Sequence, residues 1–159
     1  MKKRMSVYVC LLAVFLMVSA CSNDSEKSAP PIMYNFKEPT SYPFEISEAS
    51  TEIDIGKPDY LHQFIFTYYN EETTQRLKYI VSKVLGEQEE LSKNDKIEYQ
   101  LKNGVSAYYE ETSTSQSLWW ERHDGFLARY VYFTDNNRSE LGNYKLEIED
   151  FLDLANQVQ

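Results

Sequence analysis

Two histidines, many carboxylates and a group of aromatic side chains are the parts of this 159-residue chain that could do chemistry. His62 and His123 are the residues whose ordinary pKa lies near neutrality, so they could act as general bases. Neither stands in a Gly-x-Ser-x-Gly or His-Glu-x-x-His motif. We therefore predict no catalytic residue: His62 belongs to a strand and His123 flanks a turn.

The 25 acidic residues are too numerous to identify a site by themselves. We interpret two acidic groups as parts of solvated faces or loops. They are Glu87, Glu89 and Glu90, and Glu110 with Glu111. A sheet with this many acids nevertheless offers many carboxylate pairs, and a pair of carboxylates is what a glycoside hydrolase uses. A cell-wall hydrolase that uses carboxylates therefore remains the alternative function.

The polar run from Asp135 to Glu140 begins like a calcium-binding loop, with side-chain oxygens at alternate positions. Such a loop needs Gly at its sixth position and Glu at its twelfth. These positions hold Glu140 and Leu146. We interpret the run as a polar turn, and we predict no metal site and no cofactor.

The aromatic group of greatest interest is formed by Trp119, Tyr130, Tyr132 and Tyr109, in a chain with 13 Tyr. Rigid aromatic rings provide contact area at a small cost in conformational entropy. These four side chains either complete a sheet surface or form a platform for a peptide, a glycan or a partner protein. On the second interpretation they are the predicted ligand contacts.

Strands must position most of these residues. Residues 44–55 contain two short stretches in which apolar and polar residues alternate, and His62–Tyr69 is dense in aromatic and β-branched residues. Gln75–Leu85 fits a helical stripe that ends at Gly86, and it also fits a strand. We favour the strand.

Two dipeptides predict β-hairpins, since Asn-Gly and Asp-Gly accept the positive φ angles of a two-residue type I′ turn. A two-residue loop at Asn103-Gly104 pairs Lys102 with Val105 and Tyr99 with Tyr108. Tyr109 then lies on the opposite face.

The second hairpin turns at Asp124-Gly125 and pairs Trp119 with Tyr130. Trp120 is predicted in the core, on a face with Leu118 that Arg122 and Arg129 interrupt. Trp119, Tyr130 and Tyr132 are predicted on the opposite, partly wet face, because side-chain direction alternates along a strand.

The C-terminus changes to a helical period. Ile148, Phe151, Leu152 and Ala155 follow the spacing of an amphipathic helix with acidic residues at its start, where the helix dipole favours them. The predicted fold class is α+β: an antiparallel, strongly twisted sheet of about six to eight strands with a C-terminal helix packed on one face.

The N-terminus has the order of a secretory signal: basic residues from Lys2 to Arg4, an apolar run from Val7 to Met17, then small residues. The run is too short to span a membrane, which takes about 20 apolar residues. Val18-Ser19-Ala20-Cys21 resembles the lipobox of bacterial lipoproteins. That resemblance implies cleavage before Cys21 and attachment of a diacylglycerol to its thiol.

Three parts of the chain follow from this: a lipoprotein signal peptide at 1–20, lipidated Cys21 with a flexible proline-containing tether at 21–43, and one globular domain at 44–159. The chain has two cysteines, Cys10 and Cys21, so the domain has no thiol for a disulfide or a thiolate metal site. The net charge of -9 argues against nucleic acid as a partner, because phosphates would repel the protein.

The C-terminal half of the chain resembles an uncharacterised domain family of Gram-positive envelope and sporulation lipoproteins and anti-sigma-factor-like proteins. The residues that carry the resemblance are Lys102 to Tyr109, Leu118-Trp119-Trp120, Asp124-Gly125 and the closing helix. The resemblance covers roughly residues 95–159 and implies an envelope role with no assigned chemistry. We expect an exported protein, lipid-anchored to the outer face of the bacterial cell membrane. It would be a non-catalytic binding or sensing module for an envelope protein, a peptide or a glycan.

Overall fold

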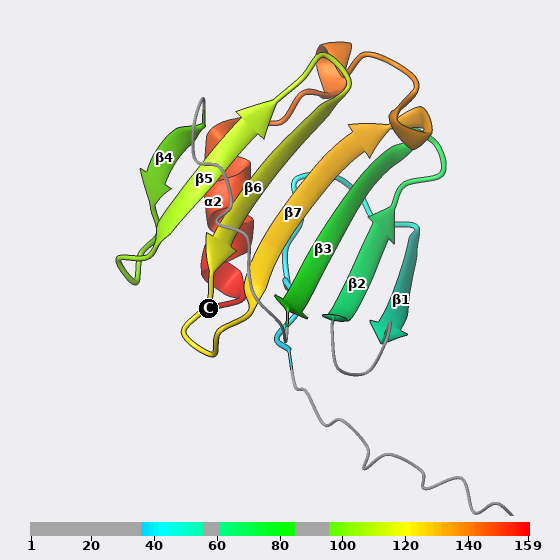
Figure 1. Cartoon of the computed structure of the whole chain (residues 1–159). Coiled ribbons are helices and arrows are strands. Elements are labelled where there is room, and N and C mark those ends of the chain that lie inside the picture. The colour runs from blue at the N-terminus through cyan, green and yellow to red at the C-terminus, as the bar shows by residue number, and fades with distance from the viewer. Residues whose placement is uncertain (1–35, 56–60, 85–95) are drawn as a thin grey trace, which may run out of the picture. The chain divides into compact units, whose positions relative to one another are not determined.

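Seven strands and one helix make up the regular structure in the parts of the chain that the computed structural model describes, which are residues 36–55, 61–84 and 96–159 (Figure 1). The predicted signal peptide, Cys21 and the first part of the predicted tether lie outside these ranges. The elements are β1 (Glu48–Ile55), β2 (Leu61–Tyr69), β3 (Gln75–Val84), β4 (Ile97–Gln100), β5 (Ser106–Glu111), β6 (Ser115–Glu121), β7 (Leu127–Thr134), two 3₁₀ turns at Asp135–Asn137 and Gly142–Tyr144, and α2 (Ile148–Gln157).

The strands form one antiparallel sheet in the order β1-β2-β3-β7-β6-β5-β4. It consists of two meanders, β1 to β3 and β4 to β7, which join where β3 pairs with β7. The predicted α+β class is confirmed, and so is the strand that we favoured for Gln75–Leu85, which β3 occupies as far as Val84.

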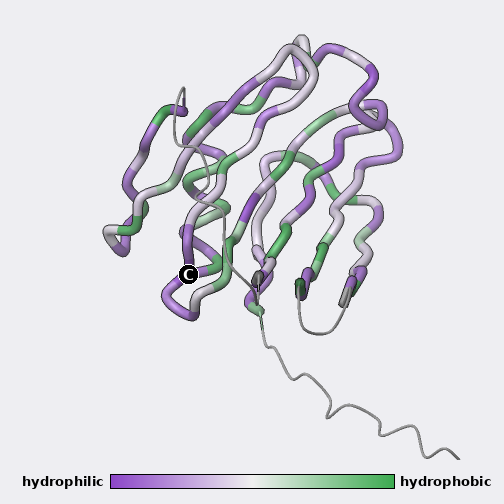
Figure 2. Tube along the Cα trace, viewed as in Figure 1, coloured by the Kyte–Doolittle hydropathy of each residue, from purple (hydrophilic) through white to green (hydrophobic). Residues whose placement is uncertain are grey.

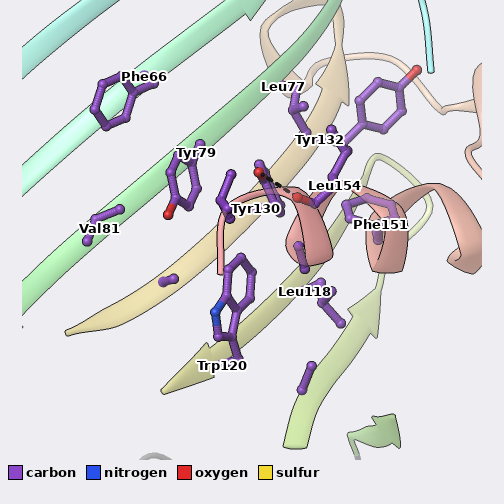
Figure 3. Close-up of a cluster of buried hydrophobic side chains, with 14 of the residues drawn as sticks. Phe66, Leu77, Tyr79, Val81, Leu118, Trp120, Tyr130, Tyr132, Phe151 and Leu154 are labelled. Atoms are coloured by element: carbon purple, nitrogen blue, oxygen red, sulfur yellow. Dashed lines mark hydrogen bonds between the residues drawn. The ribbon is translucent and has the colours of Figure 1, made fainter. Parts of the chain in front are cut away.

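One face of the sheet, which we call the core face, carries the hydrophobic core. Along β2, β7 and β3 as far as Val81, every second side chain is buried. Figure 2 shows how hydrophobic (green) and hydrophilic (purple) residues are interspersed along these strands. The largest fully buried side chains of the core include Trp120, Tyr79, Tyr130, Tyr132 and Leu118 (Figure 3). Trp120 is therefore in the core, as predicted.

The predicted C-terminal helix is confirmed as α2, which covers the core face with Phe151, Leu154 and Ala155. A capping box fixes its start: the Glu147 side chain accepts from the backbone N–H of Asp150, and the Asp150 side chain accepts from that of Glu147. The Tyr130 hydroxyl donates to the Leu154 carbonyl at 3.3 Å, drawn as the dashed line in Figure 3. Within the described ranges no helix is long and apolar enough to cross a membrane.

Residues 36–47 cover a further part of the core face beside α2. Phe36 packs edge-on against Phe64 with ring centroids 4.9 Å apart, and Phe44 lies 5.8 Å from Tyr132. Gln157 at the end of α2 holds this segment, since its Oε1 accepts from the backbone N–H groups of Thr40 and Ser41, both at 2.9 Å.

The folded unit therefore begins before residue 44, where the sequence placed the start of the domain. Residues 36–43 belong to the folded unit, because their aromatic side chains fill the space that α2 leaves uncovered. Phe44 and Ile46 are not strand residues; they pack on the core, and the first strand begins at Glu48.

Both hairpin registers differ from the predictions by one residue. Leu101 donates to the Val105 carbonyl at 2.9 Å, and Arg122 donates to the Phe126 carbonyl at 2.8 Å. Each loop therefore has three residues, with Gly at the third, at φ +82° for Gly104 and +76° for Gly125. The predicted pairs shift accordingly: Tyr99 lies opposite Ala107, Trp119 opposite Arg129, and Tyr130 opposite Leu118.

Candidate binding surface

The second face of the sheet, which we call the open face, is turned toward the viewer in Figure 1. Among the described elements, α2 and residues 36–47 lie on the core face, and neither covers the open face. The open face has half-buried apolar and aromatic side chains on its central strands and mainly polar ones at its edges. By strand register its central members are Leu61, Ile65, Tyr69, Arg76, Lys78, Ile80, Leu127, Arg129, Val131, Phe133, Trp119 and Tyr108.

A strip of cationic and apolar side chains runs along β3 and β7 at the centre of this face. Arg76 lies opposite Phe133, Lys78 opposite Val131, and Ile80 opposite Arg129. A cation therefore meets an apolar neighbour in each of these three pairs. The strip is therefore a positively charged patch with apolar side chains around it, in a protein whose net charge is -9.

Aromatic rings and a loop amide orient Arg76. Its Cζ lies 4.7 Å from the ring centroid of Tyr69 and 5.9 Å from that of Phe133, both within the range of a cation–π interaction. Its Nη1 donates to Asn136 Oδ1 at 2.6 Å. The guanidinium is thus fixed at the end of the strip without a carboxylate partner among the described residues.

Trp119 lies beside the strip, beneath two covering side chains. Its ring stacks on Tyr108 with centroids 4.5 Å apart, and Lys96 Nζ lies 5.0 Å from its ring centroid. Trp119 is only 3% exposed. It is on the face opposite Trp120, as predicted, but the prediction that it is partly wet is wrong. Its buried Nε1 has no hydrogen-bond partner in the described part of the chain.

Glu110 connects this aromatic cluster to the strip. It forms ion pairs with Lys96 at 3.2 Å and Arg129 at 2.8 Å, and Ser117 Oγ donates to its Oε1 at 3.1 Å. Burial would raise the pKa of Glu110, but the hydrogen bonds from Lys96 and Ser117 and the two cationic charges outweigh it and lower the pKa. Glu110 is therefore an ionised anchor that holds both cations in place.

The predicted aromatic contacts do not share one surface. Trp119 lies on the open face, whereas Tyr109, Tyr130 and Tyr132 point to the core face and are buried. Tyr109 donates to Glu111 at 2.7 Å, and Tyr132 donates to the Tyr144 carbonyl at 2.7 Å. The one-residue change in register is the cause, because it moves alternate side chains to the opposite face.

The prediction missed Tyr108, Arg76, Lys78 and Arg129 as open-face residues. The available signal was the position of Arg129. In the predicted register it interrupts a core face, and an unpaired cation does not belong in a core. Shifting the register by one residue places Arg129 outside and turns Tyr130 inward, as the structure has it.

The side chains considered for catalysis lie on different elements of the fold. His62 is buried on the core face of β2, and His123 is exposed in the loop between β6 and β7. Glu110, Glu111 and Asp124 are the described carboxyl groups whose pKa shifts, and all three are lowered. Glu87, Glu89 and Glu90 lie outside the described residues.

The turn predicted at Asp135–Glu140 is a 3₁₀ turn with Asp135, Asn136 and Asn137 at positive φ. Across residues 36–55, 61–84 and 96–159, no group of three His, Cys, Asp or Glu side chains is placed to hold a metal ion.

Comparison with protein-family models, with curated proteins and with solved structures finds no match for this chain. Its function must therefore be inferred from the geometry of its own residues.

Proposed function

We propose that this protein is a non-catalytic binding module, held at the outer face of a bacterial cell membrane by lipid on Cys21. In this proposal it binds an envelope protein, a peptide or a glycan through the open face of its sheet. The proposed location rests on the order of basic, apolar and small residues at the N-terminus and on Val18-Ser19-Ala20-Cys21.

The observation that carries the proposal is the difference between the two faces of the sheet. The core face is covered by α2 and by residues 36–47, whereas the open face presents the β3–β7 strip of Arg76, Lys78 and Ile80 beside Phe133, Val131 and Arg129. Surface patches that combine aromatic rings and Arg are typical of binding sites.

Charge and apolar contact would act together on this surface. The cations of the strip attract a carboxylate or phosphate group, while Ile80 and Val131 contact an apolar part of the same ligand. A hydrolase would need a carboxylic acid with a raised pKa as its proton donor. The lowered pKa values of Glu110, Glu111 and Asp124 make these three carboxyl groups unsuited to that role.

Site-specific photo-crosslinking in cells tests the use of the open face. A benzophenone side chain replaces Ile80 in the full-length lipidated chain, and the matched control replaces exposed Asp153 on α2. We expect an adduct from position 80 and none from position 153, and we expect Lys78→Glu to reduce the adduct at position 80. A protease-sensitive adduct identifies a protein or peptide partner, and a muramidase-sensitive one identifies a glycan. Equal adducts from both positions, or none from position 80, would reject the open face as the binding site.

The anchor has its own test with a matched control in the same chain. Cys21→Ala should abolish incorporation of labelled palmitate and leave an unprocessed precursor or a released protein. Cys10→Ala, which changes the other cysteine, should leave labelling intact. If labelling persists in Cys21→Ala, the proposed lipid anchor at Cys21 is rejected, whereas the proposed binding role of the open face is unaffected.

A further inference from the structure

The strand β1 is one edge of the sheet, and no other described strand pairs with its outer side. It pairs with β2 on one side and is the terminal strand of the sheet order. In an antiparallel sheet half of the backbone N–H and C=O groups of such a strand point away from its single neighbour. Every residue from Glu48 to Asp54 is exposed.

This edge is long, and the charged side chains that it carries are all acidic. Edge strands are commonly short or carry charged side chains, especially Lys, or Pro. The opposite edge, β4, is short, with four residues. β1 has eight residues, EASTEIDI, with no Lys and no Pro.

The two faces of β1 differ in charge. Glu48, Glu52 and Asp54 lie on the open-face side, since they pair with Tyr69, Ile65 and Gln63 of β2. None of the three carboxylates has an ion-pair partner in the described ranges. Ala49, Thr51 and Ile53, which alternate with them, are small or apolar and lie on the core-face side, whereas Ser50 lies on the same side as the carboxylates.

Ile53 marks where the core reaches this edge. It pairs with buried Phe64, which pairs with buried Val81, so an apolar row runs outward from the core and ends at Ile53. Ile53 is 59% exposed, which makes it one of the few large hydrophobic side chains left uncovered among the described residues. An added strand with an apolar residue beside Ile53 would continue that row.

From these observations we propose that β1 accepts an extended segment of a partner protein as an eighth strand, and that this segment alternates Lys or Arg with apolar residues. Its cations face Glu48, Glu52 and Asp54 on one side, and its apolar residues extend the row at Ile53 on the other. Backbone hydrogen bonds along β1 provide the remaining contacts. A second copy of this chain is the wrong occupant. Pairing β1 with β1 about Thr51, with the faces kept continuous, would set Glu48 opposite Asp54, and like charges opposite each other destabilise a sheet.

Synthetic peptides and the full-length chain in detergent test this proposal. The probe is a fluorescent nine-residue peptide, Lys-Val-Lys-Val-Lys-Val-Lys-Val-Lys, and its binding is followed by fluorescence anisotropy. We expect binding that weakens with salt, and slower amide hydrogen exchange in β1. A peptide of the same composition with its lysines and valines in two blocks should bind more weakly, as should one with N-methyl groups at alternate residues on its pairing edge. Equal binding of the block or N-methylated peptide would overturn the proposal, and so would failure of the alternating peptide to bind.

Two pairs of variants locate the site. Glu52→Lys should weaken peptide binding by roughly fivefold, whereas Glu140→Lys, the same charge change in an exposed loop, should not. Ile53→Lys should also weaken binding, whereas Ile97→Lys, on the opposite edge strand and 57% exposed, should not. Melting curves verify that each variant is folded. Equal effects within either pair would place the peptide elsewhere and refute the assignment to β1, while leaving the open-face proposal unaffected.

Discussion

Trp119 and Trp120 are neighbours in sequence and lie on opposite faces of β6. Trp120 stacks on Tyr79 with ring centroids 6.3 Å apart and is fully buried on the core face. Trp119 stacks on Tyr108 on the open face. The two indoles therefore report on two different environments within one strand.

Trp120→Ala is expected to unfold the domain or nearly so. The ring contacts Tyr79 and Tyr130 at the centre of the core, and removing a buried Trp costs about 3 to 5 kcal/mol through lost burial and a cavity. That is a large fraction of the stability of a small domain. Urea denaturation checks the result, with Trp120→Phe as the control that keeps part of the volume. A near-wild-type midpoint for Trp120→Ala would contradict its place in the core.

Trp119→Ala is expected to destabilise the domain by about 2 to 4 kcal/mol, because the ring is buried under Tyr108 and Lys96. At a partly wet surface position, which the sequence predicted for Trp119, the same substitution would leave stability nearly intact. Near-ultraviolet circular dichroism and thermal melting measure the effect. Trp119→Phe should recover part of the loss because stacking on Tyr108 is retained. A melting temperature unchanged by Trp119→Ala would show that the ring is not held there.

Glu110 should give the domain a pH-dependent contribution to stability. Its pKa is lowered in the folded state, so the contribution is present above the unfolded-state pKa of about 4.3 and is lost as pH falls through the lower folded value. Glu110 is 39% exposed, so solvent screening limits the effect to roughly 1 kcal/mol or less. Glu110→Gln should lower the urea midpoint at pH 7, and the difference should shrink in acid. Glu140→Gln, at an exposed loop, is the control, and a difference that grows in acid would refute the assignment.

Phe36→Ala should show that residues 36–43 belong to the folded unit. The ring packs edge-on against Phe64 and Phe126, and each aromatic pair contributes about 0.5 to 1.5 kcal/mol beyond its buried area. The variant should therefore melt at a lower temperature than the wild type. Lys37→Ala, at the exposed neighbouring position, should have little effect. Equal melting temperatures for the two variants would indicate that residues 36–43 belong to the flexible tether and not to the folded unit.

Much of the fold could be predicted because hydrophobic period is local information. The helix at Ile148–Gln157, the strand at Leu61–Tyr69 and the opposite directions of Trp119 and Trp120 all follow from spacing along the chain. The hairpin registers did not follow. Asn-Gly and Asp-Gly fit both two-residue and three-residue loops, and in the structure Gly104 and Gly125 close three-residue loops.

The surface was harder to predict than the core for the same reason. A shift of one residue exchanges the two faces of a strand, so it removed Tyr130 and Tyr132 from the predicted surface and brought Arg129 and Tyr108 onto it. Packing of residues 36–47 on the core face depends on contacts across the chain, such as Gln157 with Thr40, for which sequence spacing gives no signal.

The pairing of β3 with β7 also has a consequence for how the chain folds. Every other pair of strands in the sheet is consecutive in sequence, so β1 to β3 and β4 to β7 can each form through short-range loop closure. Tyr79 meets Tyr130 across β3 and β7, where the ring centroids are 4.9 Å apart, and closing that contact orders a much longer loop. Such long-range pairing is slow, so joining the two meanders is expected to limit the folding rate. Substitutions between β3 and β7 should then slow folding more than equally destabilising ones within either meander.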